Sequence, residues 1–293
     1  MKLKKMKHTL LKSFQKKASA FEEAYLASKG KPFFFDSDDM RTLHFDARFI
    51  QSAMRLSDPD ELLLSYTRGM MIFLLFNPQP RSILMIGLGG GSLAKYCHRM
   101  FPDTNITVLE IDEDVIALRE DFAVPPDSER FVVLHTDAKD YIATMEAKVD
   151  VILHDGFDAN GLVPALNTTA FYTTCRAALS ENGILVSNFW GDDEDLASSM
   201  ERLWSAFDSR LWWSTATASL NRVVCALHGN QDAALSDLQK QAVVLDHLYK
   251  LGFEGLAERF QTGQGKTKAE FNTMSGTTPL SALMLVENGD TKK

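Results

Sequence analysis

The chain has 293 residues, of which 45% are hydrophobic and 24% are charged, and its formal net charge is −8. The length suits one large domain, alone or with small additions, and the composition is typical of a soluble globular protein. No apolar run approaches the roughly 20 residues that cross a bilayer. The basic start is not followed by an uninterrupted apolar stretch either. We therefore expect a cytoplasmic protein with no secretory leader and no membrane partner.

The three cysteines and the charge distribution limit the ligands. Cys97, Cys175 and Cys225 are far apart and match no metal-ligand spacing, so we expect reduced thiols and no metal. Residues 1–17 hold seven lysines and no acid, so the rest of the chain is more acidic than the total suggests. A basic leader can dock on an anionic surface, although many such leaders are only solvated termini. The acidic remainder argues against nucleic acid as the main partner.

The first 55 residues predict a helix and then a small hairpin. Apolar residues spaced three and four apart over 9–28 indicate an amphipathic helix, which lies in a basic first segment of residues 1–30. Residues 41–55 predict a β-hairpin with a tight turn at Asp46 and Ala47.

A helix is expected to follow the hairpin. Asp58-Pro59-Asp60 marks a turn and a helix start, and residues 61–76 form an apolar stretch that ends at two prolines. The hairpin and this helix make up a second small segment, at residues 31–80.

From residue 81 the sequence alternates apolar strands with helices. Strands are expected at residues 82–86, 106–111, 131–134, 149–154 and 183–188, with less regular ones at 211–214 and 223–227. Strands buried on both faces and alternating with helices predict a parallel sheet covered on both sides. The fold class is therefore α/β, with a Rossmann-like, mostly parallel seven-stranded sheet over residues 81–230. Residues 231–293 are expected to form a helical extension.

The residues that follow the first two strands suit a nucleoside. Ligands of open parallel sheets bind beyond the carboxyl ends of the strands. Gly87, Gly89 and Gly91 follow the first strand, where glycine lets the backbone turn and admits a ligand against the main chain. Glu110 ends the second strand and can accept hydrogen bonds from both hydroxyls of a ribose. Both features suit an S-adenosylmethionine-type nucleoside, and both would also suit NAD.

Acidic residues follow the third and fourth strands. Asp137, with Ala138, can hold the adenine amine and ring nitrogen, or Asp137 can cap the helix that follows. Asp155 and Asp158 can hold a cation between them and accept a proton from an amine, or they can be ordinary turn residues. His154 precedes Asp155 on a buried strand and is expected to face the other side, where it would pack.

Taken in order, these motifs resemble those of the spermidine synthases, the polyamine aminopropyltransferases, over roughly residues 41–190. The hairpin ahead of a methyltransferase-like sheet is the most distinctive part of the resemblance. The matching motifs are Phe45-Asp46-Ala47 with Gln51, Asp58-Pro59-Asp60-Glu61 with Tyr66, the glycine turn that ends at Gly91, Glu110-Ile111-Asp112, Asp137-Ala138, and Asp155-Gly156-Phe157-Asp158.

The resemblance implies transfer of an aminopropyl group from decarboxylated S-adenosylmethionine to a small amine such as putrescine. Asp155 would be the general base and Asp158 would hold the amine. Gln51, counted with the donor-binding residues, and Tyr66, counted with the substrate-binding residues, would line the channel. The resemblance also implies a homodimer.

Two other functions stay open. Arg68 stands where the family carries an acid, and Gly90 stands at another position that is usually acidic in the family. Both differences favour a methyltransferase that uses intact S-adenosylmethionine, whose carboxylate Arg68 would face. The third alternative is a non-catalytic nucleoside-binding protein.

Overall fold

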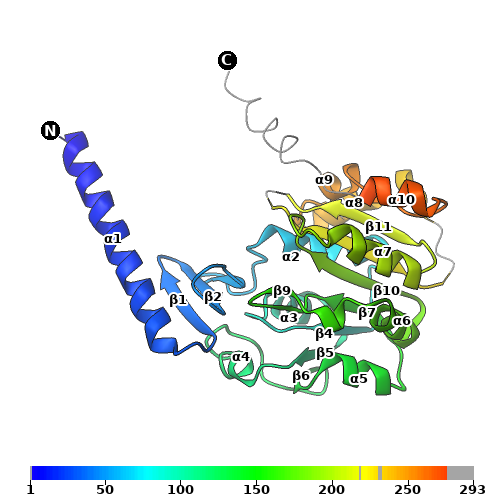
Figure 1. Cartoon of the computed structure of the whole chain (residues 1–293), viewed down its shortest axis with the longest axis horizontal. Coiled ribbons are helices and arrows are strands. Elements are labelled where there is room, and N and C mark those ends of the chain that lie inside the picture. Colours follow the sequence, from blue (N-terminus) through cyan, green and yellow to red (C-terminus); the bar gives the residue numbers. More distant parts are fainter. Residues whose placement is uncertain (1, 218, 230–232, 276–293) are drawn as a thin grey trace, which may run out of the picture.

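The computed structural model describes residues 2–217, 219–229 and 233–275 (Figure 1). Its helices are α1 (Lys2–Ser28), α2 (Ser65–Met70), α3 (Ser92–Met100), α4 (Glu113–Ala117), α5 (Ala138–Thr144), α6 (Thr169–Ala178), α7 (Leu196–Ala206), α8 (Leu235–Tyr249), α9 (Phe253–Glu258) and α10 (Lys268–Ser275), with 3₁₀ turns η1 (Met71–Leu75) and η2 (Pro164–Leu166). Its strands are β1 (Phe33–Ser37), β2 (Met40–His44), β3 (Ser52–Arg55), β4 (Ser82–Ile86), β5 (Asn105–Glu110), β6 (Phe131–His135), β7 (Val149–His154), β8 (Phe157–Asp158), β9 (Gly161–Leu162), β10 (Leu179–Phe189), β11 (Leu211–Thr215), β12 (Arg222–Leu227) and β13 (Gln261–Thr262).

A three-stranded antiparallel sheet, β1-β2-β3, precedes the large sheet. Figure 1 shows α1 extending away from the body, with its C-terminal part beside this small sheet. There the Phe21 ring packs against the rings of Phe33 and His44. The tight turn lies between β1 and β2, so the prediction of a tight turn at Asp46 and Ala47 was wrong. Residues 45–51 instead form a longer loop between β2 and β3.

The large sheet has the order β13-β11-β12-β10-β7-β4-β5-β6. Strands β10, β7, β4, β5 and β6 are parallel, and the other three are antiparallel to their neighbours. After β4 the chain goes to β5 and β6 on one side and then returns to β7 on the other. The crevice for a ligand is therefore expected between the carboxyl ends of β4 and β7.

The sheet has eight strands in the described part of the chain, rather than the seven that the sequence predicts. The eighth is the two-residue strand β13, whose Gln261 and Thr262 pair with Trp213 and Trp212 of β11. Residues 233–275 are therefore not purely helical, because they add an edge strand to the sheet. Residues 276–293, for which helix was also expected, lie outside the described residues.

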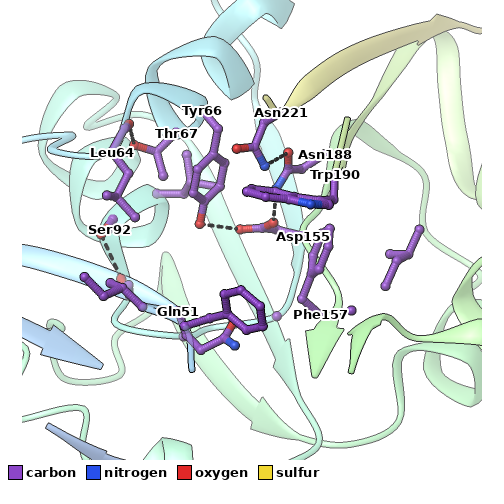
Figure 2. Close-up of a pocket in the computed structure, with 18 of the residues that line it drawn as sticks. Gln51, Leu64, Tyr66, Thr67, Ser92, Asp155, Phe157, Asn188, Trp190 and Asn221 are labelled. Carbon is purple, nitrogen blue, oxygen red and sulfur yellow. Dashed lines mark hydrogen bonds between the residues drawn. The ribbon is translucent and has the colours of Figure 1, made fainter. Parts of the chain in front are cut away.

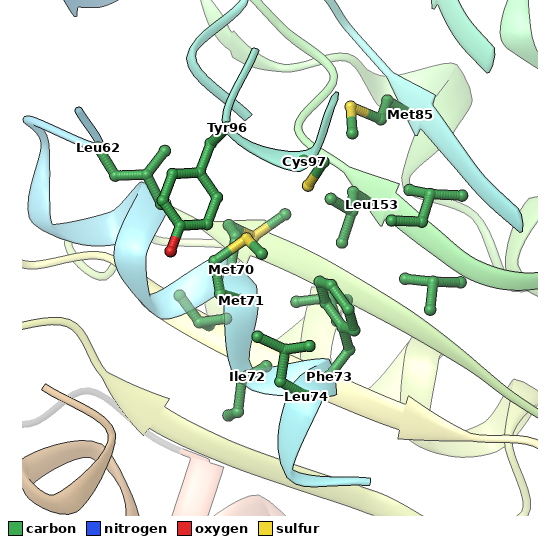
Figure 3. Packing of buried hydrophobic residues seen from close by; sticks show 14 of the residues in the cluster. Leu62, Met70, Met71, Ile72, Phe73, Leu74, Met85, Tyr96, Cys97 and Leu153 are labelled. Carbon is green, nitrogen blue, oxygen red and sulfur yellow. The ribbon is translucent and has the colours of Figure 1, made fainter. Parts of the chain in front are cut away.

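Two apolar cores lie on the two faces of this sheet. Side chains of a strand alternate between its faces, so Ile83 and Met85 of β4 join one core while Leu84 and Ile86 join the other. The first core contains residues of η1, α3, α8 and α9, and the second contains residues of α5, α6, α7 and α10. Figure 3 shows η1 packing under α3 in the first core. All three cysteines are buried as free thiols.

The helix expected over residues 61–76 is shorter, because α2 begins at Ser65 and gives way to the 3₁₀ turn η1 at Met71. Side chains donate to the backbone carbonyl oxygens that would accept hydrogen bonds if the helix began one turn earlier. The Arg68 guanidinium donates to the carbonyl oxygens of Leu62 and Leu63, at 2.7 and 3.0 Å. Leu64, just before α2, is extended (φ −77°, ψ 134°), and Leu63 and Leu64 form part of the wall of the site described next.

Candidate active site

The loop between β4 and α3 brings the main chain close to the segment after β7. Gly87, Gly89 and Gly91 have φ angles of +92°, +50° and +66°, in the region that favours glycine. A Cβ atom at Gly87 would lie only 2.6 Å from the carbonyl oxygen of Asp155. Glycine is therefore required at Gly87, since a larger residue would push the two loops apart.

Glu110, at the end of β5, is bonded to the glycine turn. Its Oε2 atom accepts a hydrogen bond from the backbone N–H of Leu88 at 2.8 Å, and its Oε1 atom accepts one from Asp112 at 2.9 Å. Only 9% of Glu110 is exposed. Each carboxylate oxygen keeps a second lone-pair direction, so the side chain can still accept hydrogen bonds from a diol.

Asp155, which follows β7, receives hydrogen bonds from both sides (Figure 2). The Tyr66 hydroxyl donates to its Oδ2 atom at 3.2 Å, and the Asn188 amide donates to its Oδ1 atom at 2.9 Å. Asn188 in turn accepts a hydrogen bond from the Asn221 amide at 3.0 Å. The carboxylate orientation is thus set by α2, β10 and the residue before β12.

The surroundings of Asp155 tune its proton affinity. Burial raises the pKa of the Asp155 carboxyl above its ordinary value, and the hydrogen bonds from Asn188 and Tyr66 oppose that rise. Burial raises the pKa of Tyr66 well above its ordinary value, so the phenol stays protonated and donates. A carboxylate with a raised pKa is suited to taking a proton from a substrate.

His154 lies on the other face of the sheet, where packing was expected. It is fully buried, and its Nδ1 atom is 2.7 Å from the Ser187 hydroxyl. Burial lowers the pKa of His154 to about 4, so the ring is neutral near pH 7.

One cavity of about 1080 Å³ brings most of the expected residues together. The expected residues that line it are Gln51, Tyr66, Gly87, Gly89, Glu110, Asp155 and Asp158. The position of the cavity agrees with the crevice expected between β4 and β7.

The remaining expected residues do not line this cavity. Gly91 lies behind the glycine turn, where it forms the N-cap of α3. Asp137 caps α5 by accepting a hydrogen bond from the Lys139 N–H at 2.8 Å, and Ala138 is buried. The backbone N–H of Thr136 donates to the Glu110 carbonyl at 2.9 Å, so the end of β6 still lies next to Glu110.

Sequence reasoning missed Asn188, Asn221 and Trp190, which also line the cavity. Asn188 and Asn221 are 3% and 7% exposed, whereas Trp190 is 44% exposed. Asn188 lies near the carboxyl end of β10, next to β7, so the strand-end rule that identified Asp155 could have found it. Asn221 precedes an antiparallel strand, and no motif marks it.

The loop over residues 157–162 forms a small hairpin at the mouth of the cavity. Asp158 is exposed, and its Oδ1 atom accepts a hydrogen bond from the Asn160 N–H at 2.6 Å. Arg48, in the loop between β2 and β3, donates to the Ala159 carbonyl oxygen at 2.9 Å. It also pairs with Asp46, at 2.7 Å between Nε and Oδ2. The small N-terminal sheet is thereby joined to the loop that carries Asp158.

No group of three or more His, Cys, Asp or Glu side chains is placed to hold a metal ion in the described residues. None of the helices formed by those residues is long and apolar enough to span a membrane.

Known proteins are similar to this chain in sequence and in fold. The family model for the spermine/spermidine synthase domain matches residues 63–189. A polyamine aminopropyltransferase of Chromobacterium violaceum is 38% identical over 234 residues, which cover 78% of this chain and 89% of the relative.

Two solved structures are similar in fold. Human methyltransferase-like protein 13, solved in complex with SAH, has a TM-score of 0.58 at 26% identity and covers 63% of this chain and 91% of that one. A probable spermidine synthase from Corynebacterium glutamicum has a TM-score of 0.65 at 17% identity, over 84% and 92% of the two chains. The large sheet is thus of the class I methyltransferase type. The match to the family model and the relative from C. violaceum together show that this chain belongs to the spermine/spermidine synthase family.

Proposed function

We propose that this protein transfers an aminopropyl group from decarboxylated S-adenosylmethionine to a small amine such as putrescine. The observation that supports this most directly is Asp155, a partly buried carboxylate with two hydrogen-bond donors, beside a glycine turn and Glu110. The family membership gives the same reaction class, since the relative from C. violaceum is a polyamine aminopropyltransferase.

The proposed reaction is a displacement at carbon. The lone pair of the amine nitrogen attacks the propyl carbon bonded to the sulfonium sulfur, and the C–S electron pair returns to sulfur, which leaves a neutral thioether nucleoside. The nitrogen loses a proton to Asp155. The leaving group needs no acid, so the protein contributes mainly by aligning nitrogen and carbon and by keeping the amine neutral.

The proposed binding roles use residues that line or adjoin the cavity. We propose that Glu110 accepts hydrogen bonds from the ribose hydroxyls and that Gln51 contacts the donor. Asp158 attracts the second ammonium group of the amine, and Tyr66 lines the channel while it orients Asp155. Asp137 and Ala138 are proposed to contact the adenine, because the end of β6 lies next to Glu110.

A second candidate function is methyl transfer from intact S-adenosylmethionine. Two observations favour it: the 26% identity to a methyltransferase solved with SAH, and the presence of Arg68 in the cavity. An assay of the nucleoside product separates the two functions. We expect methylthioadenosine from the decarboxylated donor with putrescine, and no product when putrescine is omitted. S-adenosylhomocysteine formed from the intact donor would contradict aminopropyl transfer and support the methyltransferase.

The oligomeric state and the cellular location of the protein are also proposals. We propose a cytoplasmic homodimer, supported by the buried free thiols and the family resemblance. Light scattering that shows a mass near the 32.8 kDa of one chain would contradict the dimer.

The role of Asn188 can be tested through the pH dependence of kcat/KM. In Asn188→Leu the Asp155 carboxylate loses a charge-assisted hydrogen bond, which should raise its pKa further. Asp155 acts as a base only when it is deprotonated, so activity rises as pH passes its pKa. We expect the acidic limb of the profile to move up by about one pH unit. Asn105→Leu, an exposed position on β5, is the control. An unmoved limb in Asn188→Leu would show that Asn188 does not act on the base.

A further inference from the structure

Arg68 is a cation in the wall of the cavity without an acidic partner. Among the described residues, two arginines line the cavity, Arg48 and Arg68. Arg48 is neutralised by Asp46, but Arg68 forms no ion pair within the described residues, and its Nη1 atom donates to two backbone carbonyl oxygens. A partly buried cation is stabilised most by an anion, so the missing counter-charge points to a ligand.

The acidic side chains that line the cavity do not contact Arg68. Glu110 is bonded to the backbone at the end of β5, and Asp155 is held by Tyr66 and Asn188. Asp158 is the last residue of β8, and Asp193 lies on the loop that follows β10. None of these acids forms an ion pair with Arg68.

The first turn of α3 adds a second positive group to the same cavity. Ser92, Leu93 and Ala94 line the cavity, and the N-cap residue Gly91 offers no side chain to cap them. The first N–H groups of a helix lack partners within the helix, and this end of its dipole favours anions. Arg68 and the start of α3 therefore both favour an anion in this cavity.

The glycine turn leaves no room for an acid that would reverse this charge. A Cβ atom at Gly90 would lie 2.6 Å from the Ser52 hydroxyl oxygen and 2.9 Å from the Phe122 ring. The polar groups on this side are the hydroxyls of Ser52 and Ser92, whose oxygens are 3.3 Å apart. Both hydroxyls are neutral, so this part of the wall adds no negative charge.

We infer that Arg68 and the first turn of α3 form a carboxylate subsite in this cavity, which takes a ligand of the amino-acid type. The planar guanidinium fork matches a carboxylate, and the helix amides add donors for the same anion. The inference rests on the proposed transferase function, because it assumes that the donor nucleoside and the acceptor share the cavity. The carboxylate can belong to the donor, as in intact S-adenosylmethionine, or to the acceptor, as in an amino acid.

Two matched ligand pairs distinguish these sources by calorimetry. The donor pair is decarboxylated and intact S-adenosylmethionine. The acceptor pair is putrescine and ornithine, measured with methylthioadenosine present. In the full-length protein we expect the carboxylated member of one pair to bind at least about tenfold more tightly than its partner.

Variants then show whether Arg68 causes that preference. Arg68→Gln should abolish it, Arg68→Lys should retain part of it, and Arg81→Gln, the control at an exposed arginine outside the cavity, should leave it intact. Arg68→Gln also loses two hydrogen bonds to backbone carbonyls, so thermal unfolding must confirm that it folds. If Arg68→Gln does not fold, the comparison of the wild-type protein with Arg68→Lys tests whether the preference depends on Arg68.

Each outcome has a distinct meaning. A preference for ornithine supports the subsite and is compatible with a decarboxylated donor. A preference for intact S-adenosylmethionine supports the subsite and overturns the decarboxylated donor of the proposed function. Equal binding within both pairs, or a preference that survives in Arg68→Gln, overturns the subsite alone. Failure of wild-type protein to bind either nucleoside overturns the proposed function itself.

Discussion

Asp155→Asn is expected to lower kcat by about 10²–10⁴-fold while the affinity for the donor nucleoside stays nearly unchanged. The substitution keeps the shape of the side chain but removes its ability to accept a proton from the amine. The Asn188 amide can still donate to the remaining oxygen, and the Tyr66 hydroxyl can accept from the new amide NH₂, so the fold of the cavity should persist. Rapid-quench measurement of a single turnover, combined with calorimetry of donor binding, would record both quantities.

The control for this prediction is Asp103→Asn, in an exposed turn between α3 and β5. It makes the same chemical change outside the cavity and should leave kcat as it is. If Asp155→Asn retained most of the wild-type kcat, another group would have to take the proton, and Asp155 would be left with an orienting role only.

Glu110→Gln is expected to weaken donor binding by about a hundredfold, because it removes charge-assisted hydrogen bonds to the ribose. It also places an amide NH₂ opposite one of the two backbone N–H groups, of Leu88 and Asp112, that now donate to the carboxylate. The glycine turn should therefore lose stability as well. Titration calorimetry with the donor gives the affinity, and thermal unfolding gives the stability.

Glu113→Gln is the matched control for Glu110, since Glu113 is an exposed glutamate three residues further on, in α4. Loss of stability without loss of affinity in Glu110→Gln would show that the carboxylate only braces the turn. Comparable affinity losses in both variants would point to a general effect of charge rather than to a contact with ribose.

The parallel part of the fold could be predicted from the sequence because its strands are buried on both faces and read as apolar runs. The topology then places Gly87, Glu110 and Asp155 at one edge, since parallel strands end on the same side. The hairpin loop was mispredicted, because a short polar run does not distinguish a tight turn from a longer loop. The start of α2 was mispredicted because Arg68 binds two carbonyl oxygens from outside the helical pattern.

The partners of Asp155 were harder to predict than Asp155 itself. Tyr66, which contacts the carboxylate, was expected only to line a channel. Asn188 and Asn221 reach the base through side-chain hydrogen bonds between β7, β10 and the segment before β12. The Asn188 contact crosses the parallel pair β7 and β10, whereas the Asn221 contact depends on β12 pairing antiparallel with β10, and local periodicity does not contain that information.

The attachment of Asp155 to regular elements has a consequence for how this site can diversify. The base is oriented from α2, from β10 and from the residue before β12, whereas the mouth of the cavity is built from short connections at residues 157–162, 190–193 and 219–220. Substitutions at residues 157–162 and 190–193 are expected to alter the shape presented to an acceptor without changing the side chains that orient the base. Ser219 belongs with the orienting groups, because its hydroxyl is bonded to Asn221. We therefore expect that the acceptor can change by replacement of these loops.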